Sequence, residues 1–413
     1  MSWARRLAAL AAAAALLAGC AGAPILANPP LAFPAPPTAG PGPSTPADPI
    51  PIAFPRDDGP HDRLTEWWYY TGHLQAQDGR TFGFEAVVFR AERGSVPVAW
   101  ASHLALTDEA GSRFYYAQRS EIGPQVDHSP RAAGGTPSGF DLEVAGLSPT
   151  LIANHAPPVA APWRLAGSNG SDRIQASLAP EEATAAGAQF GLDLTMQALK
   201  APALHRGNGF IDFGPAGSSY YYSRTRLSAT GVLQLKGQPI QVTGIAWFDH
   251  QWGDFVSVGA GGWDWFAINL DDGTDITLSI VRDEHAGEIL EYGTLVRPSG
   301  EVVPLAAPND FGVGTTGIGW QSPATGVTYP NGWSVLLTNP ALVPGVQVVD
   351  GSAFLNINPT VANQELDTRA TTGVAYWEGS EIVTATPTAL PGVLESRIGR
   401  AYVELTRYGL PGT

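Results

Sequence analysis

Apolar and polar residues alternate with a period of two along most of the chain from residue 56 onward, and turn residues interrupt the alternation at short intervals. Such a pattern predicts β-strands, because successive side chains of a strand point to opposite faces. Helical periodicity is almost absent, and the best helical segment, 180–189, is short and rich in alanine. Many short strands between closely spaced turns are typical of sandwiches and closed barrels. The pattern therefore predicts an all-β fold.

The strongest local signal is an Asp-Gly turn between two aromatic, β-branched runs, which predicts a β-hairpin. It occurs twice, in residues 67–90 and 263–282, and in both cases aromatic residues precede the turn. We interpret this as an internal duplication, in which two β-domains open alike. The alternative is that two unrelated hairpins resemble each other. Further strands are predicted at 101–106, 140–144, 190–198, 220–227, 231–235, 293–296, 333–337, 374–377 and 401–405, and loops at 129–139 and 207–217.

The N-terminus has the pattern of a secreted protein. Basic Arg5 and Arg6 precede an apolar run that is too short to span a bilayer, and Leu-Ala-Gly-Cys follows, ending at Cys20. This motif resembles the lipobox of bacterial lipoproteins, so we expect a signal peptide at 1–19 and a lipidated Cys20. The alternative is a plain signal peptide that happens to end near a cysteine. Ala21 is not an acidic retention residue, which by the same resemblance favours the outer membrane.

A proline-rich segment follows the cysteine. Residues 21–51 contain eleven prolines and a single charged residue, Asp48, so they predict an extended tether rather than a folded unit. The predicted organisation is a tether at 20–55, a first β-domain at 56–257 and a second at 258–413. We therefore expect a lipid-anchored protein of the bacterial cell envelope whose body stands away from the membrane.

Composition excludes several classes of function. A net charge of −15 argues against nucleic-acid binding, which needs clustered Lys and Arg. A single cysteine excludes an intrachain disulfide framework and a cysteine-built zinc site. The eight histidines show no metal-ligand spacing, and no Gly-x-Ser-x-Gly, phosphate-loop or dinucleotide motif occurs. We therefore expect a site without metal or cofactor. The sequence does not determine the oligomeric state.

The richest chemical cluster is the run 247–254. On a regular strand, Phe248, His250 and Trp252 share one face and Asp249 lies on the other, unless a bulge near Gly253 re-aims it. An imidazole between aromatic residues in a barrel lumen could donate or accept a proton in an apolar pocket. The alternative interpretation is a hydrogen-bonded core histidine.

Further ligand-binding candidates lie on other predicted strands. Glu66, Trp68 and Tyr70 would share one strand face, which sets a carboxylate beside aromatic walls; the alternative is a carboxylate at the rim. His103 has small neighbours that leave room for a ligand. Tyr221 lies in a run of three tyrosines whose hydroxyl groups need partners when buried, although an aromatic pair at a sheet edge is the commoner outcome.

Four segments, 66–74, 102–108, 220–224 and 247–253, resemble the hydroxyneurosporene synthase or carotenoid 1,2-hydratase family and its AttH-like, lipocalin-type relatives. Segments of the second half resemble the partner domain of that family: 263–273, 364–367, 376–379 and 402–406. The resemblance implies two lipocalin-like antiparallel β-barrels packed together. For the hydratase branch it implies cofactor-free addition of water to a terminal isoprenoid double bond, with His250 and Trp252 matching an essential His-x-Trp motif.

One departure leaves the catalytic acid open. The hydratases have a Tyr-x-Asp motif downstream of the histidine, and residues 277–283 contain no tyrosine. The remaining candidates for the acid are Asp249, Glu66 and Asp271. We expect an envelope lipoprotein that binds an extended apolar ligand, isoprenoid or lipid, and hydrates or isomerises it. The alternatives are a carrier without turnover and a structural envelope protein with collapsed pockets.

Overall fold

The computed structural model describes residues 48–94, 96–146, 161–255, 261–283, 285, 287–317, 319–386 and 395–408. The predicted signal peptide, Cys20, most of the tether and the domain boundary at 257/258 lie outside these residues, and they stay predictions. Within the described ranges, no helix combines the length and the apolar character that crossing a bilayer requires.

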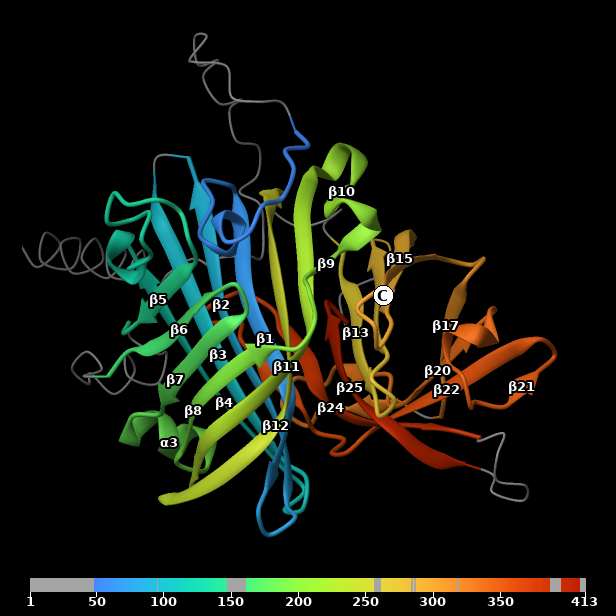
Figure 1. The fold of residues 1–413 in the computed structure, drawn as a ribbon. Coiled ribbons are helices and arrows are strands. Elements are labelled where there is room, and N and C mark those ends of the chain that lie inside the picture. The colour runs from blue at the N-terminus through green and yellow to red at the C-terminus, as the bar shows by residue number, and fades with distance from the viewer. Residues whose placement is uncertain are drawn as a thin grey trace, which may run out of the picture.

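Two large antiparallel sheets make up the all-β fold, as predicted. The first has twelve strands, ten of them in the following order: β4 (Arg113–Ile122), β3 (Val96–Asp108), β2 (Thr81–Arg93), β1 (Thr65–Ala76), β12 (Gln238–Asp254), β11 (Ser218–Leu235), β8 (Phe190–Ala198), β7 (Ser171–Ser177), β6 (Trp163–Ser168) and β5 (Phe140–Val144). Short strands β9 (Ala203–Leu204) and β10 (Phe210–Asp212) also pair with β11. This sheet curls into a nearly closed barrel, visible in Figure 1.

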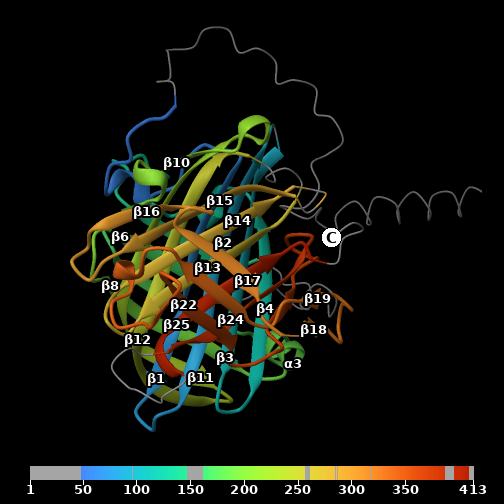
Figure 2. The same ribbon diagram turned by 90° about the vertical axis from the view of Figure 1, so that its right-hand side faces the viewer.

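The second sheet has eleven strands, nine of them in the following order: β16 (Val302–Ala306), β15 (Glu288–Val296), β14 (Asp275–Arg282), β13 (Trp263–Leu270), β25 (Ser396–Thr406), β24 (Ala375–Ala385), β22 (Ser352–Pro359), β20 (Trp333–Leu337) and β17 (Phe311–Thr315). Strands β21 (Val348–Val349) and β23 (Glu365–Asp367) pair with β22 and β24. A separate ribbon joins β18 (Trp320–Gln321) to β19 (Thr328–Tyr329). In Figure 2 this second sheet lies in front of the first.

Both predicted hairpins occupy equivalent places. In each sheet the first hairpin strand pairs with the second on one side and with the last long strand on the other, in the orders β2-β1-β12 and β14-β13-β25. A duplicated unit would produce this shared order. Two local expectations need correction: the helix α3 ends at Ala186, where Gly187 adopts a positive φ of 82°, and the predicted loop 207–217 contains β10.

The helical turns are short and lie between strands: η1 (Arg56–Asp58), η2 (Pro124–Val126), α3 (Pro180–Ala186), η3 (His205–Gly207), η4 (Gly214–Ala216) and η6 (Pro340–Leu342). Helix α3 lies where the first barrel nearly closes, beside the terminal strand β4. Its Glu182 receives two hydrogen bonds of 2.9 Å from Arg119 of β4. The same guanidinium donates to the carbonyl oxygen of Val144 in β5 at 3.3 Å. The ion pair therefore joins β4 to α3, and the same guanidinium links β4 to β5, the two edge strands that share no ladder.

Both faces of strands β1 and β12 are buried: one face lies inside the first barrel and the other packs against the second sheet. Trp68 and Phe248 belong to the apolar core inside the first barrel. Tyr69 and Trp247 face the other way and pack against Trp265 of the second sheet. The alternation predicted for these strands therefore separates the interior of the first barrel from the interface between the barrels.

Candidate functional site

The predicted site residues fall into two groups on opposite sides of β1 and β12. Inside the first barrel lie Glu66, Trp68, Tyr70, Phe248, His250 and Trp252, all buried. A cavity between the two barrels is lined by Asp249, His103 and Tyr221. The register of β12 with β1 is continuous from Trp247 to Gly253, so no bulge turns Asp249 toward His250. The three predicted catalytic residues therefore do not share one pocket. Asp271 lies in an exposed turn and pairs with Arg397 at 2.9 Å.

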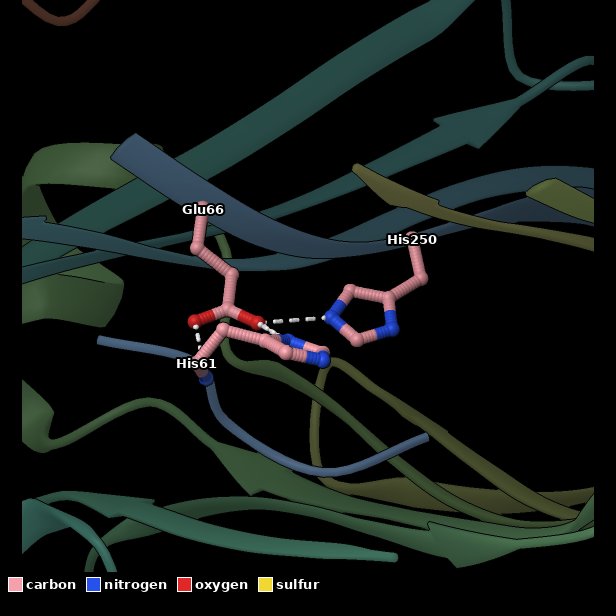
Figure 3. A group of neighbouring side chains, drawn as sticks. All are labelled: His61, Glu66 and His250. Atoms are coloured by element: carbon pink, nitrogen blue, oxygen red, sulfur yellow. Dashed lines mark hydrogen bonds and ion pairs between the residues drawn. The ribbon is translucent and has the colours of Figure 1, made fainter. Parts of the chain in front are cut away.

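Inside the barrel, Glu66 lies between two histidines, as Figure 3 shows. Its Oε1 is 2.7 Å from Nδ1 of His61 and 2.9 Å from Nε2 of His250. The ring of His61 stacks on Trp252 with centroids 4.0 Å apart, and His250 stacks on Trp68 at 4.8 Å. His61 was not among the sequence-predicted residues, because it precedes β1 and only the folded chain brings it back over the barrel interior.

The charges of this cluster follow from its contacts. Burial alone would raise the pKa of Glu66, but the charge of His61 and the hydrogen bonds from His250 and His61 lower it to about 2. Burial opposes protonation of His61, yet Glu66 and Asp57 raise its pKa. Burial lowers the pKa of His250 in spite of Glu66. The arrangement is therefore an ionised Glu66, a protonated His61 and a neutral His250 whose buried Nδ1 has no partner among the described residues.

His61, Glu66 and His250 could also hold a metal ion, since their donor atoms lie within 4.8 Å of one another. Hydrogen bonds to Glu66 already use Nδ1 of His61 and Nε2 of His250, and a metal would have to displace both protons. The interior cluster resembles the hydrogen-bonded core that the sequence left open as an alternative.

The interior cluster predicts a stability effect. His250→Phe removes a donor to the ionised Glu66, so we expect the free energy of unfolding to fall by about 1.5–3 kcal/mol. Trp252→Ala should cost about 3–5 kcal/mol because it truncates a buried aromatic side chain. Chemical denaturation followed by circular dichroism measures both, with exposed His128→Phe as control, expected within about 0.5 kcal/mol of the parent.

The pKa of Glu66 determines how this stability difference depends on pH. The pKa of Glu66 falls from 4.5 to about 2 on folding, so its contribution is present above pH 4.5 and is lost as the pH falls toward 2. The parent and His250→Phe should therefore converge in stability in acid. A constant difference between them at all pH values would contradict a hydrogen bond from His250 to an ionised Glu66.

The cavity lies between two facing rows of residues that cross the strands. In the first sheet the row runs Ser223, Asp249, Tyr69, Val87 and His103, each opposite the next on a neighbouring strand. In the second sheet it runs Tyr292, Ser279, Trp265, Glu404 and Glu378. Side chains of one row lie at cross-strand distance, so both rows concentrate polar groups at the interface.

The cavity has a volume of about 130 Å³, and its walls are largely apolar, with ten aromatic residues among the twenty-two that line it. An apolar cavity of about 150 Å³ is enough to hold benzene in another protein. The aromatic lining residues are Trp67, Tyr69, Phe89, Phe213, Tyr221, Phe255, Trp263, Trp265, Tyr292 and Tyr376. The space therefore suits a small apolar group, such as one end of a longer ligand.

Asp249 is the most strongly hydrogen-bonded acid of the cavity. Its Oδ1 accepts from Nε1 of Trp247 at 2.7 Å and from the hydroxyl of Ser223, and its Oδ2 accepts from the hydroxyl of Tyr221 at 2.5 Å. Burial raises the pKa of Asp249 to about 7, although these three donors favour the charged form. Asp249 can therefore gain and lose a proton near neutral pH.

Glu404 of β25 is a second cavity acid, which the sequence analysis did not single out. One donor, Nε1 of Trp263, contacts its Oε2 at 2.9 Å, and its Oε1 has no donor among the described residues. Burial raises the pKa of Glu404 to about 7 in spite of that bond, and the charge of Asp249 adds to the rise. Two acids with unequal hydrogen bonding in one cavity can divide the roles of base and acid.

The sequence contained only a weak signal for Glu404. It alternates with Val403 and Leu405, which lie in the core of the second barrel. An acidic residue on the other face of such a strand is typical of a solvent-exposed surface. Only the packing of the first barrel against this face converts Glu404 into a cavity residue.

Two lipocalin-like barrels that enclose an aromatic, acid-bearing cavity define the class of protein. The AttH-like family model matches residues 45–408, so the chain belongs to that family. Nearly the whole chain also matches the crystal structure of a putative AttH from Nitrosomonas europaea, with 26% identity, 88% of this chain and 98% of that one covered, and a TM-score of 0.66. No curated protein matches the sequence.

A second solved structure has the same fold at a lower level of identity. Kievitone hydratase from Nectria haematococca matches with 14% identity, 87% of this chain and 93% of that one covered, and a TM-score of 0.58. This likeness concerns the fold. The fold of this chain is therefore one on which a hydratase is also built.

Proposed function

We propose that the protein binds an apolar isoprenoid or lipid ligand in the cavity between its barrels. There it hydrates or isomerises a carbon–carbon double bond by acid catalysis without a cofactor. The observation that carries this proposal is the presence of two acids, Asp249 and Glu404, whose pKa values are both raised to about 7, on the wall of a largely apolar cavity. General acids and bases work best when their pKa lies near the working pH.

The unequal hydrogen bonding assigns the two roles. Asp249, with three donors, gives up its proton first, and its negative charge then helps to keep Glu404 protonated. In hydration, Glu404 transfers its proton to one alkene carbon, which leaves a carbocation on the other. Water adds its oxygen to that carbon, and the proton that water releases goes to Asp249. Before the next turnover Asp249 releases this proton to solvent and Glu404 takes one up. Aromatic faces such as that of Trp265 stabilise the cation in the absence of bulk water.

A non-catalytic carrier is the second candidate. A cavity enclosed by aromatic side chains would retain an apolar ligand even if no proton moved. Incubation with acyclic isoprenoids in water labelled with heavy oxygen separates the two candidates. Mass spectrometry should find a product that carries one labelled hydroxyl group, or an isomer of unchanged mass. Ligand recovered unchanged after tight binding would support the carrier.

We also propose that the protein is a cell-envelope lipoprotein held through Cys20. The support is the lipobox-like run that ends at this residue and the proline-rich segment behind it. Cys20→Ser should move the protein from the membrane fraction to the soluble periplasmic fraction, because a tether with one charge and no long apolar run has no membrane affinity of its own. Fractionation at high salt measures the change. A variant that stays in the membrane fraction contradicts the anchor.

A further inference from the structure

A second pair of buried acids lies next to the residues that line the cavity, and it has no role in the reaction proposed above. Glu85 of β2 and Glu378 of β24 come from different barrels, and each is about 1% exposed. Their carboxyl groups lie within reach of a mutual hydrogen bond once one of them carries a proton. In the described part of the chain, neither forms an ion pair with Lys, Arg or His, so nothing compensates two negative charges there. Buried acids that touch in such surroundings retain protons.

The oxygen atoms of the pair fit this conclusion. Oε1 of Glu85 lies 2.9 Å from the hydroxyl of Tyr376, and Oε1 of Glu378 contacts the hydroxyl of Tyr69. Oε2 of each acid is buried and has no donor among the described residues. Because the other oxygens face tyrosines, we assign the contact between the acids to the two Oε2 atoms. A proton on one of them supplies the hydrogen bond that both lack.

A series of hydrogen-bonded side chains runs from Gln118 to Glu85, and the donors and acceptors in it place a second proton on Glu85. Gln118 donates its Nε2 to the carbonyl oxygen of Asp367, so its Oε1 is an acceptor, and Thr371 donates to it at 2.6 Å. Thr371 must then accept from Nε2 of His103, 3.1 Å away, which leaves Nδ1 of His103 as an acceptor.

Tyr376 lies 2.7 Å from this Nδ1 and has one proton to give. With that proton directed to a neutral His103, the oxygen of Tyr376 needs a donor, and Glu85 is the group that can provide it. Burial lowers the pKa of His103 to about 3 and raises the pKa of Glu85 to about 8. The hydrogen-bond geometry and the electrostatics thus favour the same placement of protons, in which both acids are neutral.

The acid pair lies beside the proposed catalytic acid. Glu378 is the direct cross-strand neighbour of Glu404, and Tyr69, Tyr376 and His103 line the cavity. The titratable groups facing the pair are Glu404 and Glu381 of the second sheet, the tyrosines of both sheets and His103. Gln118, the last residue of the hydrogen-bonded series, is half-buried and therefore lies nearest to the surface.

We infer that Glu85 and Glu378 form a neutral acid pair that stores a proton for the cavity. The pair passes this proton to Glu404 while an apolar ligand or product still excludes water. Glu404 gains the proton, and the pair becomes a monoanion that shares the remaining one. His103 and Tyr376 then return a proton to Glu85 from the surface side. This role rests on the proposed function, whereas the protonation of the pair does not.

Infrared difference spectroscopy at pH 7 tests the stored protons without any ligand. Glu85→Gln and Glu378→Gln should each remove a carbonyl band of a protonated carboxyl group from the parent spectrum. The matched control, exposed Glu301→Gln, should remove only carboxylate bands. Circular dichroism confirms that each variant is folded, and Tyr376→Phe, which keeps both acids, provides a second test if a glutamine variant fails to fold. Loss of carboxylate bands from the glutamine variants, or no change in the protonated bands in Tyr376→Phe, overturns the acid pair.

Kinetics test the transfer. In Glu378→Gln we expect the first turnover to stay within about twofold of the parent while steady-state kcat falls by about tenfold. An equal loss in both phases overturns the storage role, because it places Glu378 in the chemical step. If the parent shows no turnover with any isoprenoid, the proposed function fails and the storage role with it. The infrared result still decides the protonation of the pair.

Discussion

Replacing Glu404 with glutamine is expected to reduce turnover by about 10²–10⁴-fold, the usual contribution of a positioned general acid. Glutamine keeps the shape of the side chain and still accepts a hydrogen bond from Nε1 of Trp263, which is 2.9 Å from Oε2 in the parent. It cannot donate a proton to an alkene. Affinity for an apolar ligand should therefore stay within about tenfold, or about 1.4 kcal/mol. Product formation in labelled water and ligand-induced quenching of tryptophan fluorescence measure the two quantities.

The pH profile identifies the acid. Glu404 works in its protonated form, so activity should fall as the pH rises through its pKa of about 7. Trp263→Phe removes the one donor that favours the charged form, and the fall should move to higher pH in that variant. Exposed Glu301→Gln serves as the control with an unchanged profile. An active Glu404→Gln enzyme, or a profile that Trp263→Phe leaves in place, would exclude Glu404 as the acid.

Breaking the ion pair at the seam of the first barrel should destabilise the protein as much as truncating the buried Trp252. Arg119→Met leaves the buried Glu182 without its partner, so we expect the free energy of unfolding to fall by about 3–5 kcal/mol. The guanidinium also lies 4.2 Å from the ring centroid of Trp163 and donates to the carbonyl of Val144. Denaturant unfolding monitored by circular dichroism measures the loss.

A double variant separates the ion pair from the packing. Glu182→Leu in the Arg119→Met background should recover part of the lost stability, because no uncompensated charge then remains. The exposed pair of Arg173 and Asp193 is the matched control, and Arg173→Met should cost no more than about 1 kcal/mol. If Arg119→Met is as mild as Arg173→Met, the ion pair does not hold the barrel seam.

Local rules determined much of this protein from its sequence. The Asp-Gly turns and aromatic runs defined the strands of both hairpins, because turn geometry and strand periodicity depend on neighbouring residues. The same alternation separated Asp249 from Phe248, His250 and Trp252 on β12. Segments spread over both halves also identified the relatives and, through them, the two-barrel fold that the structure has.

Only the tertiary structure decided what each strand face contacts. Alternation gives a strand two faces, but it does not reveal that one face of β12 encloses a packed barrel interior while the other meets a second sheet. Glu404 has the sequence pattern of a solvent-exposed residue. Glu404 and Glu378 are cavity and interface groups because β25 and β24 pack against the first barrel. The contact of Glu85 with Glu378 and that of Glu66 with His250 also depend on tertiary register. Burial and long-range approach set the protonation of these acids, and neither quantity is a property of a local sequence.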